Sequence, residues 1–120
     1  MKPNKIRWDD IKENFTDLGG TLKIIGPQLQ ASQMDVYLGR FKPGEGLLPH
    51  RHSAPLEEIY YIISGKMTVN LEGNAYEVAQ GDVVHVPAGA AHNCINNTSE
   101  ICEALFVVAP HETSPLEIVK

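Results

Sequence analysis

Short β-like runs separated by turn residues fill most of this 120-residue chain and constrain its fold more than any other feature. From about Leu22 onward, apolar or alternating runs follow one another, with Gly, Pro and Asn residues between them. Strands at this spacing predict an all-β antiparallel sandwich or barrel. The expected strands are TLKII, QMDVYLGRF, LLPHRH, IYYIIS, KMTVNL, AYEV, DVVHV, HNCIN and EALFVVA.

The two ends of the chain depart from this pattern. Near the start, WDDIKENF predicts one short helical turn, because Asp10 followed by Glu13 resembles a capping box. At the other end, the segment from Pro110 to Lys120 contains two prolines and is expected to cross the surface or a sheet edge.

Size and charge limit the kinds of partner that the chain is expected to have. Its length predicts a single domain spanning residues 1–120. The formal net charge of −5 argues against nucleic acid and anionic membranes as partners, because both are negatively charged. The sequence holds no apolar stretch typical of a signal peptide or a membrane span. Cys94 and Cys102 lack metal-finger spacing and suit reduced thiols, so we expect a cytoplasmic location.

The run GDVVHVPAGAAHNCIN combines turn residues with a histidine. Gly81 predicts a positive φ where the chain enters a strand, and Pro87 with Gly89 predicts the turn before His92. These turns are expected to aim the His92 side chain. Asn96, four residues further on, is expected to close a turn or a backbone hydrogen bond.

A second group of polar residues lies in the run LLPHRHSAPLEEIYYIIS. His50 and His52 are two positions apart, so in a strand they share one face and can bind the same ion. With Glu58 and His92 they make three imidazoles and one carboxylate, which is the residue chemistry of a metal site. This set suits one divalent transition metal ion (Fe, Mn, Ni, Co, Cu or Zn), because it contains no thiolate.

Together the two runs resemble the paired motifs of the cupin superfamily, and the resemblance covers roughly residues 34–109. It implies a small single-domain cupin, with the jelly-roll barrel that is also called a double-stranded β-helix. The amino-terminal segment and the carboxy-terminal tail are then expected to pack on the barrel or on a partner subunit. The resemblance also implies that His50, His52, Glu58 and His92 are the metal ligands.

The position of the acidic ligand is one departure from the family pattern. Five residues separate His52 from Glu58, where the pattern usually has three or four. Six residues separate Glu58 from Gly65, as the pattern expects, and a loop around Pro55 can absorb an extra residue. Glu57 satisfies only the forward count from His52 and stays an alternative ligand.

Two further residues are candidates for contact with a substrate. Tyr60, two past Glu58, is expected to point inward, where its hydroxyl can bind a substrate oxygen or donate a proton in catalysis. Cys94 lies on the same strand face as His92 and is a second candidate. The alternative is that Tyr60 fills the core and Cys94 acts as a small apolar residue. Tyr37 cannot be placed from the pattern.

The strand IYYIIS is apolar on both faces. Its inward face carries Tyr60 and Ile62, whereas Ile59, Tyr61 and Ile63 form a stripe on the opposite face. Such a stripe predicts a homodimer, as is common among cupins. The alternative is that one of the terminal segments packs over it.

The resemblance to cupins does not select a reaction, because the superfamily has many activities. The first hypothesis is a metal-dependent enzyme that acts on a small oxygen-rich organic molecule, as a dioxygenase, an isomerase or tautomerase, a cyclase or a lyase. The second is a metal-containing module that binds or senses a small molecule without turning it over.

Overall fold

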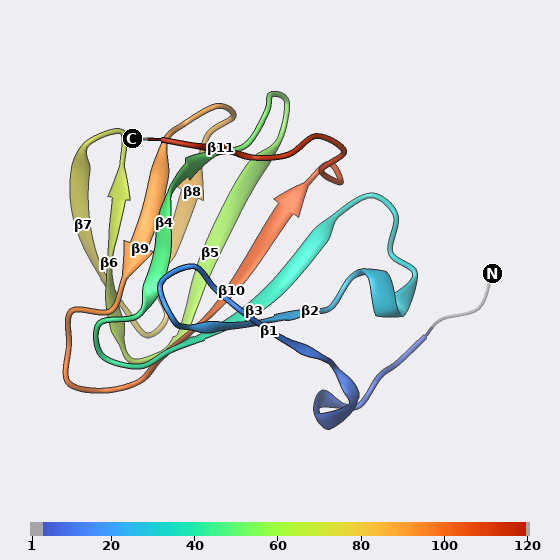
Figure 1. Ribbon diagram of the computed structural model, residues 1–120, viewed down its shortest axis with the longest axis horizontal. Helices are drawn as coiled ribbons and strands as arrows, with labels where there is room; N and C mark the ends of the chain where they lie inside the picture. The colour runs from blue at the N-terminus through green and yellow to red at the C-terminus, as the bar shows by residue number, and fades with distance from the viewer. Residues whose placement is uncertain (1–3, 120) are drawn as a thin grey trace.

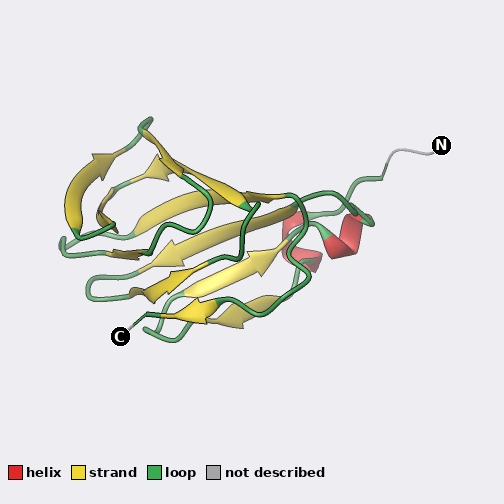
Figure 2. Cartoon of the chain, turned by 90° about the horizontal axis from the view of Figure 1, so that it is seen from above, coloured by secondary structure: helices red, strands yellow, loops and turns green. Residues whose placement is uncertain are grey.

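Two antiparallel β-sheets make up most of the computed structural model, which describes residues 4–119 (Figure 1). The parts of the predicted amino-terminal segment and tail that fall on residues 1–3 and 120 lie outside the described residues. Seen from above, the strands form two layers, and both short helices lie together at one end (Figure 2). This arrangement confirms the predicted all-β jelly-roll fold.

The first sheet has six strands, in the order β1-β2-β3-β10-β5-β8. Their bounds are β1 (Glu13–Phe15), β2 (Thr21–Ile24), β3 (Asp35–Phe41), β10 (Cys102–Ala109), β5 (Glu57–Ser64) and β8 (Val83–Val86). The second sheet has five strands, in the order β11-β4-β9-β6-β7. Their bounds are β11 (Glu117–Ile118), β4 (Gly46–Arg51), β9 (His92–Ile95), β6 (Lys66–Leu71) and β7 (Asn74–Ala79).

All of the strands expected from the β-like runs are present, with ends that shift by up to two residues. The sequence pattern missed β1 and β11, because three and two residues are too short to show a period of two. Even so, β11 pairs with the edge strand β4, as the expected path of the tail along a sheet edge predicts.

The expected helical turn is a 3-10 helix, η1 (Trp8–Asp10), and a second one, η2 (Pro27–Leu29), follows β2. The expected capping box is wrong, since Arg7 holds the N-cap position of η1 and its side chain makes no capping hydrogen bond. Within residues 4–119, no helix combines the length and the apolar character needed to cross a membrane.

The core lies between the two sheets and depends on the alternation of side chains along each strand. In β5, Tyr60 and Ile62 are fully buried, and in β6 Val69 is fully buried. The ring of Phe106 from β10 packs edge-on against Tyr60, with ring centroids 4.5 Å apart, and against Phe41, 6.2 Å away. This packing fixes the inward face of β5, on which Glu58 also lies.

The outer face of β5 carries an apolar stripe made of Ile59, Tyr61 and Ile63, which are 46%, 45% and 39% exposed. The described part of the tail pairs with β4 in the other sheet, and β1 pairs with β2 at the edge of the first sheet. The alternative that a terminal segment covers this stripe is therefore wrong for residues 4–119.

Candidate metal centre

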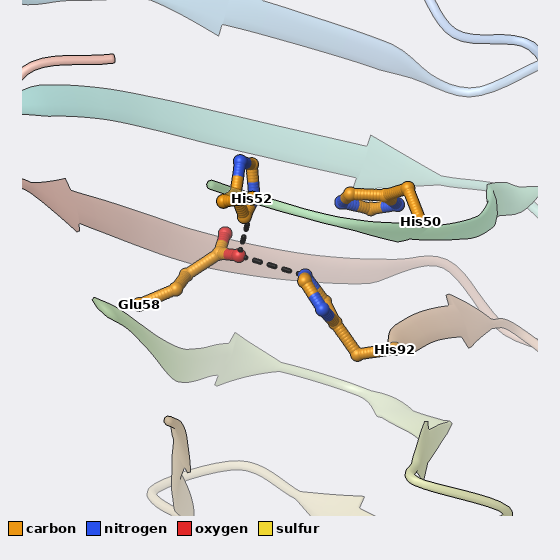
Figure 3. Close-up of side chains that lie close together, drawn as sticks. All are labelled: His50, His52, Glu58 and His92. Carbon is orange, nitrogen blue, oxygen red and sulfur yellow. Dashed lines mark hydrogen bonds and ion pairs between the residues drawn. The ribbon is translucent and has the colours of Figure 1, made fainter. Parts of the chain in front are cut away.

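Four buried side chains converge between the two sheets (Figure 3). His50 lies on β4, His52 directly after it and His92 on β9, so the three imidazoles come from the five-stranded sheet. Glu58 reaches them from β5 in the six-stranded sheet. One nitrogen or oxygen atom from each residue lies within 4.8 Å of the others. The two sequence runs thus meet at one point, as the motif spacing predicts.

Strand register explains how the histidines meet. His50 is the direct partner of His92 in the pairing of β4 with β9, and the register shifts between Leu47 and His50. The turn before His92 has Gly89 at a φ of 77° and a hydrogen bond from the Ala90 amide to the Pro87 carbonyl of 3.1 Å. A positive φ suits glycine because it has no Cβ, so Gly89 allows the turn that directs His92 inward.

The separations within the cluster fit a bound transition metal ion. Oε1 of Glu58 lies 3.2 Å from Nε2 of His52 and 2.9 Å from Nε2 of His92. Two ligand atoms that are each about 2.1 Å from an ion and at right angles to one another lie about 3 Å apart. The donor set and its spacing are therefore those expected of adjacent ligands on one ion.

Each imidazole is held by its other ring nitrogen. Nδ1 of His50 lies 2.7 Å from the Leu48 carbonyl, and Nδ1 of His92 lies 2.9 Å from the Ala90 carbonyl. A carbonyl oxygen only accepts, so both Nδ1 atoms carry the proton and donate it. Each Nε2 then presents its lone pair to the centre when the ring is neutral, which is how histidines that bind metals are commonly fixed.

His52 is held by a residue that the sequence patterns did not identify. Its Nδ1 donates to Oε2 of Glu112 at 2.7 Å. Glu112 is in turn held by Asp35, whose Oδ2 accepts from the Glu112 amide at 2.8 Å. Asp35 also accepts from Nδ1 of His111 at 2.6 Å, although the His111 side chain is half exposed. No local pattern links residues so far apart, so only the fold reveals this support.

The pKa values of the residues in the cluster depend on burial and on the hydrogen bonds between them. Burial lowers the pKa of His52, but its hydrogen bonds to Glu58 and Glu112 outweigh this effect and raise the pKa to about 9. Burial raises the pKa of Glu58, and its hydrogen bonds to His52 and His92 outweigh that and lower it. The pKa of His50 is lowered by burial. In the metal-free cluster, His52 is therefore a cation between two carboxylates at neutral pH.

Glu57, the alternative acidic ligand, points away from the cluster. Its side chain is 60% exposed, and its Oε1 accepts from Nε2 of His85 at 2.7 Å on the outer face. His85 is itself 55% exposed, so this pair lies at the surface. Of the two adjacent glutamates, Glu58 is the one whose side chain lies in the cluster.

A cavity of about 300 Å³ opens above the cluster, and His50, His52 and Glu58 line its base. Most of the remaining lining is apolar, from Phe15, Leu22, Leu47, Phe106, Leu116 and Ile118. Tyr37 on β3 also lines the cavity. Burial, and then the negative charges of Asp35, Glu112 and Glu58, raise its pKa to about 12, so the hydroxyl stays protonated at neutral pH.

The two residues expected to contact a substrate lie deeper than this cavity. Tyr60 and Cys94 are both fully buried, and neither is among the described residues that line it. Within residues 4–119 the Tyr60 hydroxyl has no hydrogen-bond partner. Burial raises the pKa of the Tyr60 hydroxyl and of the Cys94 thiol, so both are protonated at neutral pH. Their contact with a substrate stays a prediction.

Asn96 has the structural role expected of it. Its buried amide donates to the carbonyls of Phe41 and Glu100 at 2.9 and 2.6 Å, and its Oδ1 accepts from the Thr98 amide at 3.0 Å. These bonds close the loop that follows β9.

Comparisons with known proteins agree with this fold. The family described as Cupin domain matches residues 37–108. An uncharacterized protein of Methanocaldococcus jannaschii is 30% identical over 98 residues, which make up 80% of this chain and 78% of that protein. The dimethylsulfoniopropionate lyase DddW of Ruegeria pomeroyi is 34% identical over 68 residues, or 55% of this chain and 43% of the lyase.

Among solved structures, the polyketide cyclase RemF from Streptomyces resistomycificus is similar to this chain with a TM-score of 0.81. The match covers 98% of this chain and 85% of the cyclase, at 23% identity. At that level of identity, the likeness concerns the fold.

Proposed function

Because the chain belongs to the cupin family, we propose that it is a metal-dependent enzyme acting on a small oxygen-bearing organic molecule. The observation that carries this proposal is the buried cluster of His50, His52, Glu58 and His92 at the base of a cavity. In our proposal these four residues are the ligands of one divalent transition metal ion. Such an ion would supply Lewis-acid polarisation of a bound oxygen or, if redox-active, chemistry with dioxygen.

The chain's own residues would position the reactants. The Leu48 and Ala90 carbonyls and the Glu112 carboxylate fix the rings of the three histidines, so the ligand atoms need no rearrangement when a substrate binds. The Tyr37 hydroxyl, protonated at neutral pH, is placed to donate to a substrate oxygen as negative charge develops on it. The apolar lining limits the access of water, which strengthens each of these interactions.

The reaction type is left among a dioxygenase, an isomerase or tautomerase, a cyclase and a lyase. Two proteins similar to this chain are named as a lyase and a cyclase, which supports the proposal of an enzyme. These names do not identify the type of reaction. The second candidate is a metal-containing module that binds or senses a small molecule. It rests on the absence of a lysine from the described residues that line the cavity, which reduces the choice of general acids.

The test begins with metal analysis of protein purified without chelators and without a nickel column. The proposal expects about one transition metal ion per chain in the wild type and a large loss in His92→Ala. Protein loaded anaerobically with Fe(II) is then mixed with catechols, diketones and flavonols and exposed to air. Consumption of oxygen, or conversion of a substrate without oxygen, supports the enzyme. Tight binding without turnover across the panel favours the binding module, and protein without metal contradicts both.

We also propose that the protein is a cytoplasmic homodimer. The exposed stripe of Ile59, Tyr61 and Ile63 supports the dimer, because a partner subunit would bury apolar surface that is otherwise in water. Val83 on the neighbouring strand β8 extends this surface and is 61% exposed. The two free cysteines, both buried, suit a reducing compartment.

A further inference from the structure

With the histidines neutral, as binding to an ion requires, the charged side chains that line the cavity within the part of the chain that the structure describes are carboxylates. Asp17, Glu58 and Glu112 line it, and no lysine or arginine does so. The two positive charges of one divalent ion neutralise the Glu58 carboxylate and one negative charge of a bound substrate. A substrate with two negative charges would thus bring at least one charge into the cavity without a cationic side chain to pair with it. Burying an unpaired charge is costly, so phosphates and dicarboxylates fit this cavity poorly.

The polar groups of the lining are mostly engaged by the protein itself. The Thr16 hydroxyl donates to the Gly46 carbonyl and accepts from the Gly20 amide, each at 2.9 Å. Asp17 accepts from the Leu48 amide at 3.0 Å. Oε2 of Glu112 accepts from Nδ1 of His52 at 2.7 Å. The remaining carboxylate oxygens of Asp17 and Glu112 can accept a hydrogen bond, but they cannot donate one to a substrate oxygen.

The Tyr37 hydroxyl is different. Tyr37 lines the cavity, and its hydroxyl is protonated at neutral pH. It can therefore donate one hydrogen bond to a substrate oxygen near the centre.

Apolar side chains from both ends of the described chain gather at the mouth of the cavity. Phe15 on β1 is 86% exposed, and Leu116 and Ile118 in the tail are 40% and 49% exposed. Leu22, Leu47 and Phe106 continue this apolar surface inward. A ligand with an apolar framework would remove this surface from water, whereas a polar ligand would leave it exposed.

We propose that the substrate is a mostly apolar molecule, neutral or singly charged when bound, that carries a pair of oxygens able to chelate the ion. Its oxygens would face the cluster and Tyr37, and its ring-sized apolar part would lie between Phe106 and the mouth. A volume of about 300 Å³ is at the lower end of known small-molecule sites, which fits a molecule of one or two rings. This inference rests on the proposed metal site and adds the class of substrate.

The test uses two probes with the same chelating group. Acetylacetone and benzoylacetone are both β-diketones, and benzoylacetone has a phenyl group where acetylacetone has a methyl. Their affinities for the zinc-loaded protein are measured by calorimetry, each relative to the affinity of the same probe for free Zn²⁺. We expect benzoylacetone to bind about tenfold to a hundredfold more tightly, because its ring is buried against the apolar lining. Oxalate and glucose 6-phosphate should bind more weakly than either diketone on the same scale.

Metal content after each titration distinguishes failure of the metal site from failure of the proposed substrate class. If zinc is not retained in the untreated protein, the metal site fails and this inference fails with it. If zinc is retained but oxalate or glucose 6-phosphate binds as tightly as benzoylacetone, the inference about substrate class is wrong and the metal site stands. Equal affinity for the two diketones also overturns it.

A charge placed at the mouth provides a second test. Leu116→Lys changes an exposed side chain outside any strand, so we expect it to fold as the wild type does. It should lower the preference for benzoylacetone over acetylacetone several-fold and strengthen the binding of glucose 6-phosphate. Tyr76→Lys is the matched control, since Tyr76 is 50% exposed on β7 and does not line the cavity. The inference is wrong if Leu116→Lys leaves the preference unchanged, or if the control changes it equally.

Discussion

Glu112 accepts a hydrogen bond of 2.7 Å from Nδ1 of His52, a residue 60 positions earlier in the chain. The carboxylate orients the ring and increases the basicity of Nε2, which faces the centre of the cluster. A residue of the tail thus supports a cluster whose four members all come from the two sequence motifs.

Removing this support should weaken metal binding without unfolding the protein. We expect Glu112→Ala to lower the affinity for Zn²⁺ by about tenfold to a hundredfold, since the loss of a carboxylate partner to a metal-bound histidine typically has this effect. Competition with a chromophoric chelator measures the change. Glu117→Ala is the matched control in the same segment, because Glu117 is exposed and pairs with Arg51. Equal losses in both variants would assign the effect to the tail as a whole.

The two adjacent glutamates provide a test of the acidic ligand. Glu58→Gln should lose most of the bound metal, because a neutral amide replaces the carboxylate that faces His52 and His92. Glu57→Gln should bind metal as the wild type does, since its side chain lies on the outer face with His85. Plasma emission spectroscopy of the dialysed proteins gives the metal content. Retention of a full equivalent by Glu58→Gln contradicts the assignment.

Metal binding should depend on pH through His52. Its pKa in the metal-free protein is raised to about 9, so the ring is protonated at neutral pH and must lose this proton before Nε2 can bind a metal. Apparent affinity should therefore increase with pH and level off near pH 9, with a change of about tenfold per pH unit for one proton. Calorimetry at pH 7.5 in two buffers of different ionisation enthalpy should give about one proton released per ion from this residue. Binding without proton release would contradict the raised pKa.

The two tyrosines near the cluster should behave differently when their hydroxyls are removed. Tyr37→Phe should lower the affinity for benzoylacetone several-fold, because it removes a hydrogen-bond donor from the cavity. Tyr60→Phe removes a buried hydroxyl that has no partner within residues 4–119, so it should preserve or increase thermal stability. Both are measured on zinc-loaded protein. If Tyr60→Phe weakens the probe more than Tyr37→Phe does, the original prediction that Tyr60 contacts the substrate is the better one.

Charge on the outer face of β5 should break the proposed homodimer. Tyr61→Glu places a carboxylate in the middle of the stripe, where a partner subunit would have to bury it. We expect light scattering with size exclusion to give a dimer for the wild type and a monomer for this variant. Tyr76→Glu, on the exposed strand β7, should remain a dimer. A monomeric wild type would rule out this proposal.

The strands and the cluster were predictable because both depend on local patterns. Alternation along β5 places Glu58 with Tyr60 and Ile62, and the turn at Gly89 precedes His92, so the inward direction of these side chains follows from spacing alone.

The surroundings of the cluster depend on contacts between distant parts of the chain, and no sequence period encodes them. Glu112 and Asp35 meet across 77 positions, and Phe15 and Leu116 come together only because β1 and the tail reach the same cavity. Tyr37 and Tyr60 each lie on a strand with inward-facing residues, but only their depth decides which one meets the cavity. The surroundings of the cluster are therefore set by the fold, whereas the four residues proposed as metal ligands follow from the motifs.

Three imidazoles come from one layer of the sandwich and the carboxylate from the other. An ion bound to all four residues would therefore link the two layers. The unfolded chain cannot present these groups together, and the free energy of holding the ion is added to the cohesion of the folded state. Separating the two layers would therefore also release the ion.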